Sequence, residues 1–149
     1  MTIMRAIGEA LPQAAALAAE LWPGNTPDGL LAEWEALPPA EGAVFLAQAD
    51  GAFVGFAQCQ LRRDYVEGTH TSPVGYLEGV YVREAYRGRG LARALLQVCE
   101  DWAAGQDCRE FASDCELDNA GSITFHLGAG FTEVNRIVCF IKPLGGDKE

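Results

Sequence analysis

The sequence predicts an α/β domain built around a mixed β-sheet. The chain has 149 residues, of which 49% are apolar and 21% are charged, and this length and composition are typical of one globular domain. Turn signals separate two helices, then three consecutive strands, and then a helix, a strand, a helix and a strand. That order indicates a three-stranded meander followed by one parallel crossover near the middle of the chain.

The first half of the chain supplies two helices and the meander. An Ala- and Leu-rich stretch over 9–22 predicts a helix that stops before Pro23. Thr26 followed by Pro27 is typical of an N-cap and a first helical residue, and the helix that begins there should end at Pro38-Pro39. The hairpin signal Asp50-Gly51 joins the first two of the expected strands, which cover 43–49, 53–61 and 73–82.

The second half supplies the crossover. From Leu91 to Trp102 the apolar side chains follow the i, i+3, i+4, i+7 spacing of an amphipathic helix, and Gly105 ends it. We expect a strand over 109–115, a short helix over 119–127 and a last strand over 131–142. These elements predict one domain that covers 1–149.

Charge and composition exclude several functions. The net charge is −10, and an acidic surface repels nucleic-acid backbones and attracts cations. No apolar run reaches the roughly 18 residues that span a bilayer, and the N-terminus lacks a secretory leader, so we expect a cytoplasmic protein without a membrane partner. The five cysteines are odd in number and lack CxxC spacing, which favours packing as small apolar residues over disulfides or a metal site.

The segment from Tyr81 to Arg93 is the most informative for chemistry. A strand leads into a loop that contains Gly88 and Gly90, and a helix follows. The first amides of a helix are unpaired and carry partial positive charge, and glycines let a phosphate approach the backbone. Arg87, Arg89 and Arg93 add positive charge. The segment therefore predicts a site for a ligand that carries a pyrophosphate, with an ordinary basic turn as the alternative.

The spacing Arg87-x-x-Gly90-x-Ala92 resembles the Arg/Gln-x-x-Gly-x-Gly/Ala signature of the GNAT acetyltransferase superfamily. It lacks the lysine of a Walker loop and the GxGxxG dinucleotide pattern. Stretches over 64–69, 72–82 and 110–119 resemble one branch of the superfamily, the aminoglycoside 6′-N-acetyltransferases, and Trp22 fits that branch too. The resemblance implies a single-domain GNAT fold, in which two parallel strands of the mixed sheet splay apart between flanking helices, and acetyl-CoA as co-substrate.

The resemblance also implies which residues hold acetyl-CoA. The backbone of Val80, Tyr81 and Val82 would pair with the pantetheine arm, and the Val80 amide would donate to the thioester carbonyl as charge develops there. Asn119 would contact the coenzyme near that arm. The pyrophosphate would lie on the loop and the first helical turn, which consist of Arg87, Gly88, Arg89, Gly90, Leu91, Ala92 and Arg93.

An aminoglycoside is a polycation, so its site needs carboxylates and flat faces for sugar rings. Glu78 and Asp114 lie at the ends of two strands, where they can face one crevice, and both match drug-contacting positions of the resembled branch. Trp22 and Tyr65 would be the flat walls. In the alternative, the two carboxylates are solvated strand-end charges and Trp22 is a core residue at the end of its helix.

Further acidic groups would complete the substrate site. Members of the branch can carry an acidic residue near Asn135, and Glu133 would substitute for it from the same strand face. Both therefore belong to the expected substrate-binding set. Glu116 and Asp118 are additional candidates, although Asp118 can serve as the cap of the short helix instead.

The expected reaction is direct attack of a neutral 6′-amine on the thioester. Glu78 is the candidate base, either directly or through water. No base partner is evident for Cys99 or Cys115, so no acyl-enzyme is expected. His126 stands where many GNAT enzymes place a tyrosine; it is the candidate catalytic donor to the leaving thiolate when protonated, although this departure leaves the general acid unassigned. The alternative is that His126 only packs near the coenzyme.

Two other functions stay open at this stage. An acidic cleft suits any cationic amine, so a polyamine or a protein N-terminus is a second candidate substrate, although the pair Trp22 and Tyr65 favours rings. A non-catalytic module that senses acetyl-CoA or holds a cationic drug is a third candidate. The resemblance further implies a homodimer to which the last strand contributes.

Overall fold

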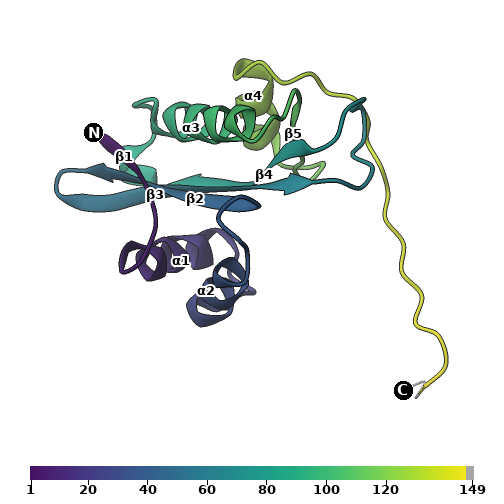
Figure 1. Cartoon of the computed structure of the whole chain (residues 1–149), viewed down its shortest axis with the longest axis horizontal. Coiled ribbons are helices and arrows are strands. Elements are labelled where there is room, and N and C mark those ends of the chain that lie inside the picture. The colour runs from purple at the N-terminus through teal and green to yellow at the C-terminus, as the bar shows by residue number, and fades with distance from the viewer. Residues whose placement is uncertain (147–149) are drawn as a thin grey trace.

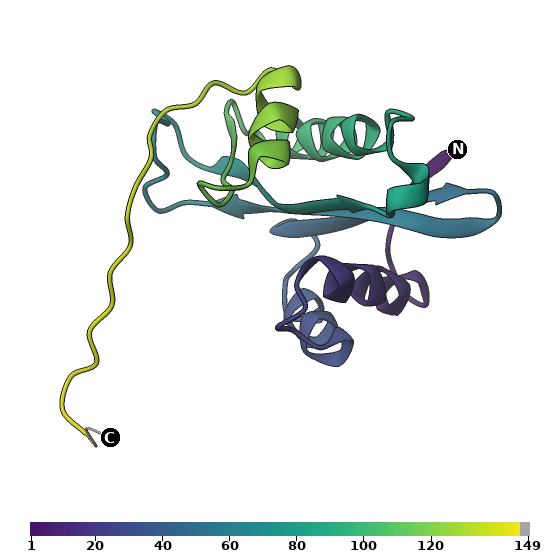
Figure 2. The same ribbon diagram turned by 180° about the vertical axis from the view of Figure 1, so that it is seen from behind.

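The computed structural model describes residues 1–146, which form three layers (Figure 1). Helices α1 (Ala10–Leu21) and α2 (Pro27–Glu35) cover one face of a β-sheet. Helices α3 (Leu91–Gly105) and α4 (Ala120–Gly128) lie on the other face, as the reverse view in Figure 2 also shows. None of the helices in this part of the chain is long and apolar enough to cross a membrane.

The sheet has five strands in the order β1-β2-β3-β4-β5. They are β1 (Thr2–Arg5), β2 (Gly42–Ala49), β3 (Ala52–Arg62), β4 (Val74–Val82) and β5 (Phe111–Ser113). Neighbours are antiparallel except β4 and β5, which are parallel and joined through α3. A single 3₁₀ turn, η1 (Glu84–Tyr86), follows β4. The expected mixed sheet with one parallel crossover is confirmed.

Local sequence signals account for most of these boundaries. The hydroxyl of Thr26 accepts a hydrogen bond of 3.0 Å from the Gly29 amide, and Pro27 is the first residue of α2. Asp50 and Gly51 have φ angles of 53° and 75°, the left-handed pair that a two-residue hairpin requires. The interpretation of both segments is confirmed.

Each face of the sheet has its own core. Under α1 and α2 the largest fully buried side chain is Phe56, and under α3 it is Leu95. Cys59 and Cys99 are buried in the second core, where a hydrogen bond to Cys59 and burial raise the pKa of the Cys99 thiol.

The expectation that the cysteines pack as small apolar residues is wrong for two of the five. Cys115 follows β5 and Cys139 lies near the C-terminus, and both are exposed.

The expected strand over 131–142 is wrong. Residues 131–144 have no regular secondary structure, and Figures 1 and 2 show this segment running away from the domain. A strand needs a neighbour to pair with, and the sheet formed by the described residues ends at β5, which is shorter than the expected 109–115. We call residues 132–146 the C-terminal arm. Sequence analysis also missed β1, which has only four residues.

Candidate active site

Strand β4 separates from β5 partway along its length. The last parallel pair joins Leu77 to Ser113, and β4 continues to Val82 with a neighbour only on its β3 side. This is the splayed parallel pair that the sequence analysis expects. Beyond Leu77, the open side of β4 presents backbone groups that have no strand partner among the described residues.

The direction of these backbone groups follows from one hydrogen bond. The Arg83 amide donates to the carbonyl of Val54 on β3 at 2.8 Å. Alternate residues of a strand direct their amides to the same side, so the amides of Val80 and Val82 point away from β3 and into the opening. Val80 is therefore oriented as an oxyanion donor on this edge requires.

A β-bulge in β4 places Glu78. In the antiparallel pairing, Gln58 lies opposite Gly79 and Cys59 lies opposite Leu77, so Glu78 is an extra residue without a partner on β3. A bulge bends its strand and redirects side chains. Bulges are frequent next to active sites for this reason.

The bulge sorts the neighbouring side chains onto different faces. Leu77 and Val80 both pack into the core under α3, although they are three residues apart. Glu78 lines a pocket under α2, and Gly79 contacts Trp22 at the end of α1. Without the bulge, residues 78 and 80 would share one face.

The loop after β4 forms a small cavity on the α3 side. Gly88 and Gly90 both have a φ of 81°, and Gly90 is the N-cap of α3. The cavity has a volume of about 200 Å³. It is lined by Val82, Tyr86, Arg87, Gly88, Gly90, Leu91, Ala92, Arg93 and Phe125. The open amides, the missing Cβ atoms and the helix N-terminus fit a pyrophosphate with its pantetheine arm.

The three arginines of this segment are held in different ways. Arg87 Nε donates to the Val82 carbonyl at 2.7 Å, and Arg89 lies over the Tyr86 ring at 5.0 Å from its centroid. Arg93 Nη1 donates to the carbonyl of Gly128 at the end of α4, at 2.8 Å. Arg93 thus ties α3 to α4, and it also lines the cavity.

His126 lies beside the point where the strands part. Its Nε2 is 2.8 Å from Ser113 Oγ, and its Nδ1 is 2.7 Å from the Ser122 carbonyl. A carbonyl only accepts, so Nδ1 carries a proton and Nε2 of the neutral ring is the acceptor. In this state His126 has no free proton for a leaving thiolate. The ring also packs against Phe131, with centroids 5.0 Å apart, which agrees with a packing role.

Asn119 caps the helix that carries His126. Its side chain accepts a hydrogen bond of 3.0 Å from the Ser122 amide. Asn119 rather than Asp118 is thus the N-cap of α4. Asn119 and the residues on either side of it are exposed, so its side chain lies at the surface, on the face of the sheet that α3 and α4 cover.

The two predicted strand-end carboxylates, Glu78 and Asp114, belong to one network. Arg62 binds both oxygens of Glu78 through Nε and Nη2 at 2.9–3.1 Å, and its guanidinium lies 3.5 Å from the centroid of the Tyr76 ring. The Tyr76 hydroxyl donates to Asp114. Burial and this hydrogen bond to Asp114 raise the pKa of Tyr76. The structure thus connects the two predicted carboxylates through a pair of residues that the sequence analysis did not select.

Trp22 lies directly over β4. An added Cβ at Gly79 would be 2.6 Å from Trp22 Cη2, so only glycine leaves room for the ring. The indole packs edge-on against Phe56 with ring centroids 5.8 Å apart. Trp22 is half-buried, so both a core role and a wall beside Glu78 fit its position.

Tyr65, Glu133 and Asn135 lie elsewhere. Tyr65 is 78% exposed and donates to Glu67, which also accepts from Asn135 Nδ2 at 2.8 Å. Glu133 is paired with Arg136 at 2.9 Å. Because residues 131–142 form no strand, the shared strand face expected for Glu133 and Asn135 is wrong. Within residues 1–146, no hydrogen bond or ion pair links either of them to Glu78 or Asp114.

The polar residues that sequence reasoning missed share one face of β3. Gln58, Gln60 and Arg62 alternate with apolar residues and point toward α2 and β4. The signal was present as a period-2 polar pattern at the end of an apolar strand. The residues of α2 that lie across the pocket from this face are Glu33 and Trp34. The sequence gives no such signal for them, because the spacing of Trp34 predicts a core residue of the helix.

The fold and the coenzyme loop define an acetyltransferase. Residues 11–131 match the model of the acetyltransferase (GNAT) family, so the chain belongs to this family. The matched region ends at Phe131, before the C-terminal arm.

Relatives and solved structures are similar over nearly the whole chain. The chain is 46% identical over 143 residues to an aminoglycoside N(6′)-acetyltransferase type 1 of Stenotrophomonas maltophilia, covering 93% of each chain. It is 40% identical to the enzyme of the same name from Salmonella typhimurium, covering 83% of this chain and 86% of the relative.

Two solved structures have the same fold. AAC(6′)-Iy in complex with the bisubstrate analogue CoA-S-monomethyl-acetylneamine has a TM-score of 0.87 and 36% identity, covering 95% of this chain and 97% of that one. The aminoglycoside 6′-N-acetyltransferase AAC(6′)-Ih from Acinetobacter baumannii has a TM-score of 0.86 and 39% identity, covering 97% and 99%.

Proposed function

We propose that this enzyme transfers the acetyl group of acetyl-CoA to the 6′-amine of aminoglycoside antibiotics and thereby confers resistance. The observation that carries the proposal is the similarity to enzymes of that name over most of both chains. The site supports it, because carboxylates of β4 and of the segment after β5 lie beside the opening between these strands.

Acetyl-CoA supplies an activated thioester, and the chain supplies its orientation. The amides of Val80 and Val82 face the opening and would align the pantetheine arm, together with the backbone of Tyr81. The loop from Arg87 to Arg93 would hold the pyrophosphate through its glycines, its cations and the first amides of α3. The Val80 amide would stabilise the negative charge that develops on the thioester oxygen.

Glu78 would receive the proton of the attacking amine. Arg62 donates twice to Oε2 of Glu78 and once to Oε1, so Oε1 retains a lone pair for a further hydrogen bond from an ammonium or a water. Asp114, held by Tyr76, would bind another cationic group of the drug. Trp22 would form the flat wall above Gly79.

His126 would act as an acid only when its ring is doubly protonated. The neutral ring holds its one proton on Nδ1 against Ser122. Its position between Ser113 and Phe131 favours support of the opening over proton donation. We therefore propose that the thiolate is protonated by water rather than by this side chain.

The functional unit is proposed to be a homodimer in the cytoplasm, where acetyl-CoA is available. Apolar side chains of the C-terminal arm, such as Phe140 and Ile141, are 91% and 95% exposed, and β5 leaves its outer edge uncovered among the described residues. Apolar area of this kind is stabilised by burial against a partner, and an open edge accepts an added strand. A second copy of the chain would cover the exposed apolar side chains and add a strand to the edge of β5.

The arm gives the test of the dimer. The double variant Phe140→Glu with Ile141→Glu should be a monomer in analytical ultracentrifugation, whereas Thr132→Glu, which adds charge to the same arm, should remain a dimer. A monomeric wild-type chain at micromolar concentration would overturn the homodimer.

Release of coenzyme A tests the reaction. Kanamycin and tobramycin should be acetylated, and an otherwise identical analogue with a 6′-hydroxyl should not. Turnover of spermidine or a basic peptide alone would retain the family and overturn the substrate. Coenzyme binding without turnover of any amine would indicate a sensor instead.

A further inference from the structure

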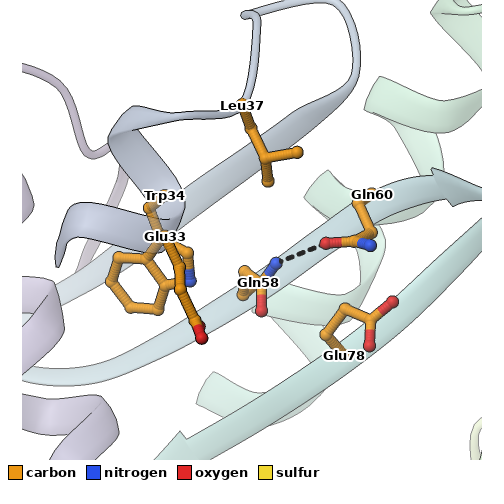
Figure 3. A pocket seen from close by; sticks show the side chains of 6 residues that line it. All are labelled: Glu33, Trp34, Leu37, Gln58, Gln60 and Glu78. Atoms are coloured by element: carbon orange, nitrogen blue, oxygen red, sulfur yellow. Dashed lines mark hydrogen bonds between the residues drawn. The ribbon is translucent and has the colours of Figure 1, made fainter. Parts of the chain in front are cut away.

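A second cavity lies under α2, on the face of the sheet opposite the coenzyme loop. Its volume is about 300 Å³. Figure 3 shows the side chains that line it: Glu33, Trp34, Leu37, Gln58, Gln60 and Glu78. Only Glu78 among them is a site residue that the sequence predicts.

Two buried residues direct polar atoms without partners into this cavity. Gln58 is 6% exposed and Trp34 is 7% exposed. Gln58 Nε2 donates to Gln60 at 3.0 Å, but among residues 1–146 no group bonds to Gln58 Oε1 or to Trp34 Nε1. In this part of the chain, the only fully buried side-chain nitrogen or oxygen without a partner is Trp102 Nε1. The two atoms therefore open to solvent, and the cavity is the space that they reach (Figure 3).

The charges leave room for one cation. Arg62 balances Glu78. Within the described residues Glu33 forms no ion pair, and it is exposed at the cavity rim. The local net charge is therefore −1. Gln58 Oε1 and the Glu33 carboxylate are both acceptors on this cavity, and an ammonium held between them would donate a hydrogen bond to each.

We propose that this cavity is a second substrate subsite for a ring that bears an ammonium and a neighbouring hydroxyl, joined to the ring that is acetylated. The inference rests on the proposed function. The ammonium would bind Glu33 and Gln58 Oε1, and the hydroxyl oxygen would accept from Trp34 Nε1. Trp34 and Leu37 would form the apolar side of the subsite.

The position and chemistry of the cavity fit a hydroxylated ring. Glu78 lines it, and Val80 lies two residues further along β4, or about 7 Å, so one molecule can reach both places. The volume is at the lower end for small-molecule pockets, which suits one ring and not a whole drug. A fully protonated polyamine has no oxygen for the Trp34 N–H, so Trp34 separates the two classes of amine.

The test compares a large and a small acceptor. Methyl 6-amino-6-deoxyglucoside carries only the acetylated ring of kanamycin. For Glu33→Gln, KM for kanamycin should rise about tenfold, the value for one charge-assisted hydrogen bond, with kcat within about twofold. The same variant should leave kcat/KM for the single-ring glucoside unchanged. Glu35→Gln, an equal loss of charge on the same helix outside the cavity, should behave as wild type with both.

A second variant tests the subsite without changing its charge. Trp34→Phe removes the N–H and retains an aromatic ring, so KM for kanamycin should rise about three- to fivefold while any turnover of spermidine is unchanged. Equal behaviour of Glu33→Gln and Glu35→Gln with kanamycin, in a wild type that acetylates it, would overturn the subsite and leave the proposed function intact. A wild type that acetylates neither sugar would overturn both.

Discussion

The contact between Trp22 and Gly79 tests directly how the substrate wall is built. A methyl group at position 79 would lie 2.6 Å from Trp22 Cη2 and closer still to Cζ2, with Leu21 Cδ2 at 3.3 Å. Carbon atoms prefer separations of about 3.5 Å or more. In Gly79→Ala the indole must therefore move by about 1 Å, away from β4 and against its edge-on contact with Phe56.

We expect both stability and substrate binding to suffer. Overpacking of this kind costs about 1–3 kcal/mol, which lowers Tm by roughly 2–12 °C for a chain of this size. A shift of about 1 Å in a positioning group can cost up to about a hundredfold in rate. We therefore expect kcat/KM for kanamycin to fall by about 10–100-fold, and KM for acetyl-CoA to stay within about twofold of wild type.

The assay is coenzyme A release under saturating acetyl-CoA, with a thermal melt of each variant. Gly105→Ala is the matched control, because an added Cβ there meets nothing within 4 Å and alanine favours a helix by about 1 kcal/mol. It should melt at or above the wild-type temperature with unchanged kinetics. If Gly79→Ala shows the same melting temperature and the same kanamycin KM as wild type, Trp22 is not held by this contact.

Two further predictions concern the network and the helix cap. Burial and the hydrogen bond to Asp114 raise the pKa of Tyr76, so the folded state favours the neutral phenol. The stability that this contributes is lost as pH rises above the ordinary pKa of about 10. Between pH 9 and pH 11, the free energy of unfolding in urea should therefore decrease less for Tyr76→Phe than for wild type. Asn119→Ala removes the hydrogen bond that caps the Ser122 amide and should lower the stability by about 1 kcal/mol. Asn119→Asp keeps this cap. A higher KM for acetyl-CoA in Asn119→Asp at unchanged Tm would therefore assign Asn119 a contact with coenzyme.

The strand, loop and helix around Gly88 and Gly90 could be predicted because their signals are local. A loop between a strand and a helix, with glycines at fixed positions, needs only the residues between Tyr81 and Arg93, and most of the loop and the first helical turn line one cavity. The caps and the hairpin belong to the same class. Interactions within a few residues of each other can be inferred without knowledge of the tertiary structure.

The connection between Glu78 and Asp114 could not be predicted because it depends on pairs of residues that are distant in the sequence. Glu78 and Asp114 were selected, but their connection runs through Arg62 and Tyr76, which the register of three strands brings together. The expected strand over 53–61 stops one residue short of Arg62, and the structure makes Arg62 the last residue of β3. A period-2 pattern cannot reveal which strand lies opposite.

The C-terminal arm shows a different limit of pattern reading. The run Ile137–Ile141 has the composition of a strand, and composition reports what a segment can form when a neighbour is present. Within residues 1–146 the chain offers no neighbour, and the segment stays extended with its apolar side chains exposed. The strand propensity of the segment was judged correctly, but the described residues offer no strand for it to pair with. For this reason the proposed homodimer is built on the arm.

The bulge at Glu78 explains how one strand can serve two substrates. With regular alternation, Glu78 and Val80 would point to the same face, and a carboxylate would lie in the core under α3. The extra residue instead sends Val80 into that core and Glu78 to the α2 face, while the Val80 amide still points into the opening beside β5. A thioester aligned in the opening and an amine approaching from the α2 face would then meet at the edge of β4. Gly79 sits between them, because only a residue without a side chain admits Trp22 at this point.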